Sequence, residues 1–224
     1  MAQGKLKTQF VCNECGGVSS KWQGQCPHCS AWNQLEEVSV RAGNTPSRRP
    51  LAGGSRTGEV VNIDQVPDES VERFRTGSDE FDRVLGGGLV AGSVVLIGGD
   101  PGVGKSTLLL QALIRMEVDR PVLYVTGEES ASQVALRARR LGLTDASTPL
   151  LTETELELIL DAVQTRRPAV VVIDSIQTMY SLALDSAPGS VTQVRECAAR
   201  LTRMAKSTGV AIVMIGHVTK EGTL

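Results

Sequence analysis

The segment 98–107 constrains this chain more than any other, because residues 99–106 fit the pattern G-x-x-x-x-G-K-[ST]. An apolar run at 94–97 precedes it and a helix-forming run at 108–114 follows it, which is the strand–loop–helix setting that a phosphate-binding loop requires. The glycines let successive backbone N–H groups point at a phosphate, and the helix that begins near Lys105 adds the positive end of its dipole. The pattern therefore predicts a site for a nucleoside triphosphate.

Individual residues of this loop have expected roles. Lys105 is expected to reach the β- and γ-phosphates of ATP, and the Ser106 hydroxyl is expected to bind Mg²⁺. The other expected nucleotide-binding residues of the loop are Gly99, Asp100, Pro101, Gly102, Val103, Gly104 and Thr107. The alternative is a glycine-rich turn without a ligand, and the complete pattern with both flanking elements argues against it.

Acidic residues end two of the other predicted strands. Asp174 ends the run 169–174, where an acidic residue binds Mg²⁺ beside the loop serine; capping of the next turn is the alternative. Glu128 and Glu129 follow the strand 122–125, at the edge where ligands of open α/β sheets bind. Since hydrolysis needs a group that orients or deprotonates water, Glu128 is the expected general base and Glu129 the second choice. A pair of carboxylates that merely favours a helix start is the alternative.

Four of the five cysteines form two C-x-x-C pairs, Cys12 with Cys15 and Cys26 with Cys29. Two such pairs are typical of a zinc ribbon, in which four thiolates close a tetrahedral site and metal binding supplies most of the folding free energy. Redox dithiols are the alternative, but no thioredoxin-like strand–helix pattern surrounds either pair. His28 lies inside the second pair and could replace a cysteine ligand.

Three further side chains have competing interpretations. Trp22 and Trp32 are expected to pack over the small metal core, with stacking on a nucleic-acid base as the alternative. Cys197, on a predicted helix, is expected to be a small buried thiol. His217 follows the last predicted strand and either senses the γ-phosphate or is an ordinary loop residue.

Strand-like and helix-like runs alternate through the second part of the chain, which predicts an α/β fold with a mostly parallel sheet and helices on both faces. The expected helices lie at 74–85 with Ser78 as N-cap, 108–114, 131–141, 156–164 and 191–207, and the expected strands at 94–97, 122–125, 150–151, 169–174 and 210–216. An Arg-, Gly-, Ser- and Pro-rich stretch separates this part from the cysteines. We expect a zinc ribbon at 1–39, a flexible linker at 40–59 and the α/β domain at 60–224.

Composition excludes some classes of protein. The N-terminus has no apolar run behind its charges, and no run approaches the length of a membrane span, so neither a secretory signal nor membrane insertion is expected. Because the paired cysteines are interpreted as metal ligands and not as disulfides, a cytoplasmic location is expected. The formal net charge of −2 gives no overall argument for nucleic-acid binding, although the chain before Gly58 is locally basic.

Four segments together resemble one family. They are the ribbon motif at 21–33 (KWQGQCPHCSAWN), the run at 83–90 (RVLGGGLV), the phosphate-binding loop with its flanks at 96–109, and the strand end at 124–130 (YVTGEES). These motifs resemble the bacterial RadA (Sms) family of RecA-like ATPases, and the resemblance extends over nearly all 224 residues.

The resemblance implies a RecA-like core and a DNA-dependent ATPase of recombinational DNA repair that promotes branch migration on single-stranded and branched DNA. It implies ATP, Mg²⁺ and Zn²⁺ as ligands, homo-hexamers for the full-length family, and a recombinase of the RecA type as a partner. By resemblance, Glu128 is the catalytic glutamate, Asp174 belongs to the second acidic motif, and His217 couples the nucleotide state to DNA binding. Residues 179–190 correspond to the first DNA-contacting loop.

The sequence departs from the family at Leu224, where the second DNA loop should begin. The family's Lys-Asn-Arg-Phe-Gly motif and its Lon-protease-like C-terminal domain do not follow, so the ATPase core is expected to be truncated and its own turnover is open. Two alternatives therefore stand beside a motor. One is a non-hydrolysing interaction module that binds nucleotide and zinc. The other is a RecA-like signalling kinase of the circadian-clock type, which shares the Glu128–Glu129 pair but gives no reason for the zinc ribbon.

Overall fold

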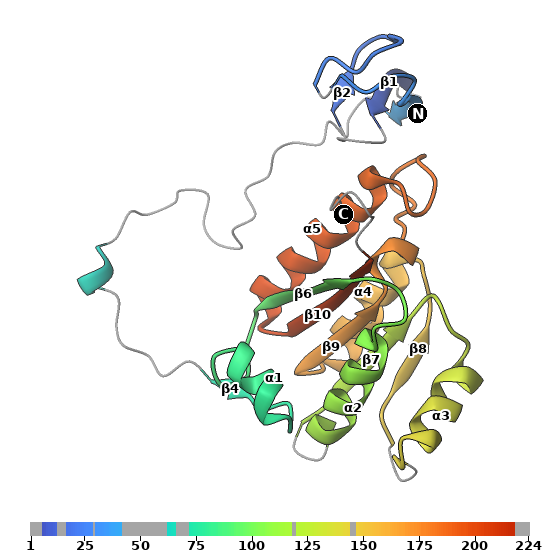
Figure 1. Cartoon of the computed structure of the whole chain (residues 1–224). Coiled ribbons are helices and arrows are strands. Elements are labelled where there is room, and N and C mark those ends of the chain that lie inside the picture. The colour runs from blue at the N-terminus through green and yellow to red at the C-terminus, as the bar shows by residue number, and fades with distance from the viewer. Residues whose placement is uncertain are drawn as a thin grey trace.

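The computed structural model describes residues 6–12, 17–28, 30–41, 62–65, 72–117, 120–143 and 147–217 (Figure 1). The expected linker therefore lies almost entirely outside the described residues, as do Cys15 and Cys29. Within the part of the chain that the structure describes, no helix combines the length and apolar character needed to cross a membrane.

A five-stranded parallel sheet forms the centre of the larger domain (Figure 1). Its strand order is β6-β10-β9-β7-β8. The strands are β6 (Val94–Gly99), β7 (Val122–Thr126), β8 (Leu150–Thr152), β9 (Val170–Asp174) and β10 (Ala211–His217). Every strand predicted from an apolar run is present, and the α/β fold with a parallel sheet is confirmed.

Helices cover both faces of this sheet. They are α2 (Lys105–Glu117) and α3 (Ala131–Arg140) on one face, and α4 (Leu156–Arg166) and α5 (Val191–Thr208) on the other. The two faces follow from the alternation of side chains along each strand. In β9, Val170 and Val172 pack in the apolar cluster of α2, whereas Val171 and Ile173 pack in the cluster of α4 and α5. Because both faces are covered, β9 is apolar from Val170 to Ile173, as predicted, and it ends in Asp174.

Local signals explain where the helices begin and end. Ser130 and Gln133 form a reciprocal capping box at the start of α3, and the Ser190 hydroxyl accepts from the Gln193 N–H at the start of α5. Gly209 ends α5 in the left-handed conformation that glycine favours.

Short elements precede β6 and follow β9. They are η1 (Ile63–Gln65), the antiparallel pair β4 (Arg73–Phe74) and β5 (Leu89–Val90), helix α1 (Asp79–Val84), and the single turn η2 (Ile176–Thr178) after β9. Ser78 occupies the N-cap position of α1, as expected, although its side chain makes no capping hydrogen bond.

The N-terminal module is a three-stranded antiparallel sheet of order β2-β1-β3. Its strands are β1 (Leu6–Cys12), β2 (Val18–Ser19) and β3 (Leu35–Arg41). Cys12, Cys26 and Leu35 are buried together with Phe10 packed against them. So few apolar residues form this core that the module needs a further source of stability, which a bound metal supplies in ribbons of this size.

Candidate functional site

The expected site residues meet at the carboxyl edge of the parallel sheet. His217 pairs with Gly99 across β10 and β6, and Asp174 pairs with Thr126 across β9 and β7. Glu128 follows Thr126 after one residue. The strand order therefore places the phosphate-binding loop, His217, Asp174 and Glu128 along one edge, where ligands of parallel α/β sheets bind.

The loop between β6 and α2 fits a polyphosphate. Gly99, Gly102 and Gly104 have φ values of 153°, 84° and 96°, which favour glycine. A Cβ built at Gly102 or Gly104 meets no protein atom within 4 Å, so the space beside these backbone positions is open. The Lys105 side chain is buried, and its Nζ donates to the carbonyl oxygens of Gly99 and Asp100 at 2.7 Å each. A buried ammonium group and the start of α2 thus lie beside an open backbone cradle.

Glu128 is held by two residues from other strand ends. The Ser175 hydroxyl donates to Oε1 of Glu128, and Nε2 of His217 lies 3.0 Å from the same oxygen. Burial alone would raise the pKa of Glu128, but the hydrogen bonds from Ser175 and His217 and the charges of His217 and Lys105 outweigh it and lower that pKa. Glu128 is therefore ionised at neutral pH.

Glu129 has a different environment from its neighbour. Its carboxylate forms an ion pair with Arg137 of α3. The Thr126 hydroxyl accepts from the N–H groups of both Glu128 and Glu129, at 3.3 and 3.2 Å. This turn holds both backbones against one hydroxyl, while the two carboxylates contact different partners. Glu128 alone of the two contacts His217 and Ser175, so the geometry favours it over Glu129 as the water-orienting group.

Asp174 presents one oxygen that has no protein partner. Its Oδ2 accepts a hydrogen bond from the Tyr124 hydroxyl at 2.5 Å, whereas its buried Oδ1 has no partner among the described residues. Asp174 continues the alternation of Val170 and Val172, which places it on the α2 face of β9. Ser106 lies in the first turn of α2. A buried carboxylate oxygen without a partner, on the side of the loop serine, fits a divalent cation.

Sequence reasoning missed three residues of this site. Ser175 and Gln177 follow Asp174 in a polar stretch, and Gln177 Nε2 donates to the His217 carbonyl oxygen at 3.1 Å. Tyr124 lies inside an apolar strand, where a tyrosine is ordinarily interpreted as a residue of the hydrophobic core. The available signal was chemical, because a tyrosine in a fully buried strand needs an acceptor for its hydroxyl.

The loop expected to contact DNA is anchored at its base. Gln193 of α5 accepts from the Ser181 N–H at 2.8 Å and donates to the carbonyl oxygens of Ser181, Leu184 and Ser186. Backbone hydrogen bonds join Tyr180 to Thr154 and to Leu156 on the neighbouring chain segment. Leu182 lies between the anchored residues Ser181 and Leu184, and its side chain is 66% exposed. The loop therefore combines a fixed backbone with an exposed apolar side chain.

The cysteine knuckles of the ribbon are alike in their hydrogen bonds. The Cys12 N–H donates to the Gly17 carbonyl oxygen and the Cys26 N–H to that of Ala31, both at 2.9 Å. The His28 N–H donates to the Cys26 sulfur at 3.4 Å. A Cβ on Gly17 would lie 2.4 Å from the His28 ring, so the two knuckles pack face to face.

This arrangement fits a four-cysteine metal site, with Cys12 and Cys26 placed and buried. Cys15 and Cys29 lie outside the described residues, so the complete ligand set stays a prediction. His28 Nε2 lies 3.4 Å from the Val18 carbonyl oxygen, which gives this ring nitrogen a partner other than a metal.

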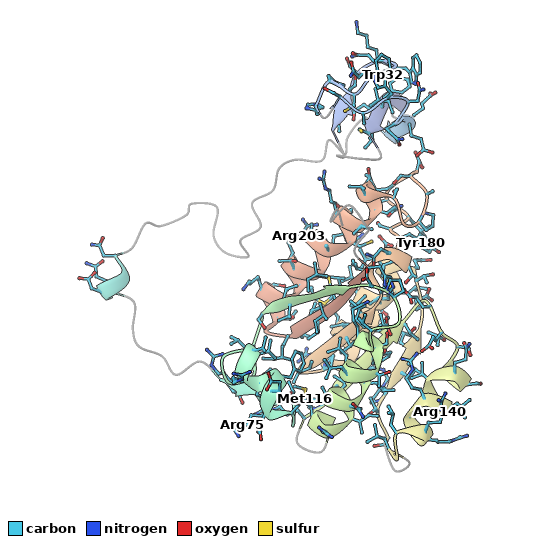
Figure 2. All side chains as sticks on the ribbon, in the orientation of Figure 1. Trp32, Arg75, Met116, Arg140, Tyr180 and Arg203 are labelled. Carbon is cyan, nitrogen blue, oxygen red and sulfur yellow. The ribbon has the colours of Figure 1, made fainter. Side chains whose placement is uncertain are left out.

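The other expected side chains are placed as follows. Trp32, labelled in Figure 2, is 68% exposed and Trp22 is 58% exposed, so the expectation that they cover the metal core is wrong. The buried set around Cys12 and Cys26 is already closed by Leu35 and Phe10, which leaves the indoles outside. Cys197 is fully buried, as expected, and burial raises the pKa of its thiol to about 12.

Taken together, the parallel sheet, the glycine cradle and the acidic edge define a P-loop nucleotide-binding protein with a RecA- or KaiC-like fold and an N-terminal zinc ribbon. The AAA domain family model matches residues 62–223, and the chain belongs to that family. A second model, the rubredoxin metal binding domain, matches residues 10–37. Both halves of the predicted architecture are therefore confirmed.

The curated relatives agree with this assignment. The chain is 53% identical over 222 residues to the DNA repair protein RadA of Salmonella typhimurium, which covers 97% of this chain and 48% of the relative. The chain is 54% identical over 223 residues to RadA of Pseudomonas aeruginosa, a match that covers 98% of this chain and 48% of the relative. It is 47% identical over 222 residues to RadA of Bacillus subtilis, with the same two coverages. The chain is thus a RadA homologue that spans about half the length of these relatives.

Among solved structures, the chain is similar to a KaiC-like protein of the archaeon Pyrococcus horikoshii OT3, with a TM-score of 0.56 and 23% identity. The match covers 66% of this chain and 73% of that protein. At this identity the similarity concerns the fold alone, and it confirms the expected RecA-like core.

Proposed function

We propose that this chain is the nucleotide-hydrolysing part of a DNA repair ATPase that acts on single-stranded and branched DNA and promotes branch migration. One observation carries the proposal: Glu128 is held by Ser175 and His217 at the same sheet edge as the phosphate-binding loop and the unpartnered Asp174 oxygen. A structural carboxylate pair would not need this convergence of three strand ends. The names of the relatives support the repair context.

The chain's own residues would act as follows. The loop N–H groups and Lys105 bind and orient the polyphosphate of ATP. Ser106 and Asp174 hold Mg²⁺, which when bound neutralises charge on the phosphate oxygens. Glu128 orients the attacking water and accepts a proton from it. Its lowered pKa keeps it ionised, so orientation is the larger part of its contribution.

His217 would couple hydrolysis to DNA. Its ring contacts Glu128, and its carbonyl oxygen accepts from Gln177 of η2, directly before the loop 179–190. A shift of Glu128 on loss of the γ-phosphate would pass through His217 and Gln177 to that loop. This is an order–disorder coupling of the type known for phosphate-sensing switches.

The remaining parts of the proposal concern zinc and partners. Cys12, Cys15, Cys26 and Cys29 hold a structural zinc, which the match to a rubredoxin metal binding domain supports. The domain limits 1–39, 40–59 and 60–224, a hexameric ring in the longer relatives, a RecA-type recombinase as partner and a cytoplasmic location all remain part of this proposal.

ATP hydrolysis with and without single-stranded DNA tests the function. We expect turnover by this chain, or by the Bacillus subtilis relative with the equivalent substitutions, to be stimulated by DNA and lost in Lys105→Ala. Equal rates with and without DNA that are independent of Lys105 would contradict the proposal. Tight nucleotide binding without any turnover in the longer relative would indicate the interaction module instead.

A further inference from the structure

Tyr124 is a buried phenol in the middle of β7. It is 1% exposed, and its ring packs in the apolar cluster that α2, α3 and the sheet share. It faces the same side of the sheet as Asp174, because Tyr124 lies two residues before Thr126 and Thr126 pairs with Asp174. The phenol oxygen therefore reaches the carboxylate from within the core.

The hydrogen bond between these two residues is short, and Tyr124 is its donor. The Tyr124 oxygen lies 2.5 Å from Oδ2 of Asp174. The phenol hydroxyl is the donor of this bond and the carboxylate oxygen its acceptor. Glu128 receives its hydrogen bonds from Ser175 and His217, so Tyr124 serves Asp174 separately.

The consequence is an asymmetric carboxylate. One oxygen of Asp174 is fixed by the phenol, and Oδ1 is buried without a partner among the described residues. Without the phenol hydroxyl, both oxygens would be buried and the carboxylate could rotate about its Cβ–Cγ bond. A buried anion whose orientation is not fixed is a poorer ligand, because partners that orient metal-binding groups are worth about 10–100-fold in metal affinity.

We propose that Tyr124 is a positioning residue that sets the affinity of the nucleotide site for its divalent cation by holding the Asp174 carboxylate. This inference rests on the proposed function, in which Asp174 and Ser106 hold Mg²⁺. It differs from a packing role for Tyr124, which the ring alone fulfils and which Tyr124→Phe retains.

The test is the Mg²⁺ dependence of nucleotide binding, measured by the anisotropy of a fluorescent ATP analogue. We compare the unchanged chain with Tyr124→Phe, Asp174→Asn, the double variant, and Tyr180→Phe as the matched control, since these are the chain's 2 tyrosines. Tyr124→Phe is expected to raise the Mg²⁺ midpoint about tenfold. Its affinity for the analogue in EDTA should stay within about twofold, because the phosphate cradle is unchanged.

The outcomes distinguish the role of Tyr124 from the metal-binding role of Asp174. In the Asp174→Asn background, Tyr124→Phe should add no further change, since both act through one carboxylate. A midpoint that moves in Asp174→Asn and stays unchanged in Tyr124→Phe would overturn the role of Tyr124 and leave the proposed function standing. If Asp174→Asn itself does not move the midpoint, the metal role of Asp174 fails and the inference fails with it.

A second measurement serves if Tyr124→Phe does not fold. In the Tyr180→Phe variant, 3-fluorotyrosine labels Tyr124 alone. Addition of Mg²⁺ to the nucleotide-loaded protein should shift the ¹⁹F resonance, and the shift should be absent in the Asp174→Asn variant. A resonance that ignores Mg²⁺ in the unchanged Asp174 background would overturn the inference.

Discussion

The His217 imidazole lies 3.0 Å from the Glu128 carboxylate and thereby joins the ends of β10 and β7, which lie on opposite sides of β9. The two residues are 89 positions apart in the sequence. Their contact crosses the end of the strand that carries Asp174. In the proposed function, this contact would couple hydrolysis at Glu128 to the rest of the domain.

Ser175 should tune the acid side of the pH profile. Its hydroxyl donates to Glu128 and is the first of the contacts that lower the pKa of that carboxyl against the effect of burial. Removal of the donor in Ser175→Ala therefore raises the pKa of Glu128, and the acid limb of the rate profile moves to higher pH. We expect a rate loss of about tenfold at neutral pH for one lost charge-assisted hydrogen bond. The pH dependence of single-turnover hydrolysis measures this shift.

Ser175→Thr keeps the hydroxyl and is the conservative control, expected to restore the position of the acid limb. An acid limb that does not move in Ser175→Ala would mean that the serine does not determine the ionisation of Glu128.

The ion pair between Glu157 and Arg200 should contribute stability that depends on pH. Glu157 accepts from Ser181 at 2.7 Å and pairs with Arg200. Burial acts to raise the pKa of Glu157, but the hydrogen bonds from Ser181 and Arg200 and the charge of Arg200 lower it below its usual value of 4.5. A carboxyl whose pKa is lower when folded stabilises above its unfolded pKa, and this stability is lost as the pH falls through the folded value.

Glu157→Gln should accordingly lower the free energy of unfolding by about 1 kcal/mol at pH 7, a fall in Tm of about 2–4 °C. The difference should shrink as the pH falls below about 4.5. The matched control is Glu196→Gln, whose partner Arg203 lies 3.7 Å away in a more exposed pair. Equal effects of the two substitutions at pH 7 would show that the Ser181–Arg200 environment adds nothing.

Tryptophan fluorescence alone should report the removal of zinc. Both tryptophans of the chain, Trp22 and Trp32, belong to the ribbon. A strong chelator should change their fluorescence and release about one zinc per chain, because the buried core of the ribbon is too small to fold unaided. Nucleotide binding by the sheet domain should persist in the same sample. Unchanged fluorescence after complete metal loss would contradict a structural role for the metal.

Much of the fold was predictable because local patterns and tertiary structure agree. Short apolar runs such as 169–174 are typical of strands buried on both faces, and the pattern at 99–106 predicts the strand before it and the helix after it. The ribbon was predictable from cysteine spacing. The prediction that Trp22 and Trp32 are buried was wrong. Indole side chains are usually buried, but the core of this ribbon is too small to cover them.

The candidate site was predictable in its residues and not in its contacts. Glu128 and Glu129 are neighbours with the same chemistry, and only the fold shows that one meets His217 while the other meets Arg137. Ser175 belongs to none of the motifs, and the motif at 124–130 assigns no role to Tyr124, because the contacts of both residues depend on the pairing of β7 with β9. Such contacts depend on strand register, which the hydrophobic pattern of each strand alone does not specify between partners.

The most direct test compares Glu128→Gln with Glu129→Gln in parallel assays of ATP binding and single-turnover hydrolysis. We predict that Glu128→Gln retains ATP binding and loses hydrolysis by about 10²–10⁴-fold, the usual contribution of a positioned base. Glu129→Gln should retain both, apart from a loss of stability where it pairs with Arg137. Hydrolysis that survives in Glu128→Gln and is lost in Glu129→Gln would contradict the account.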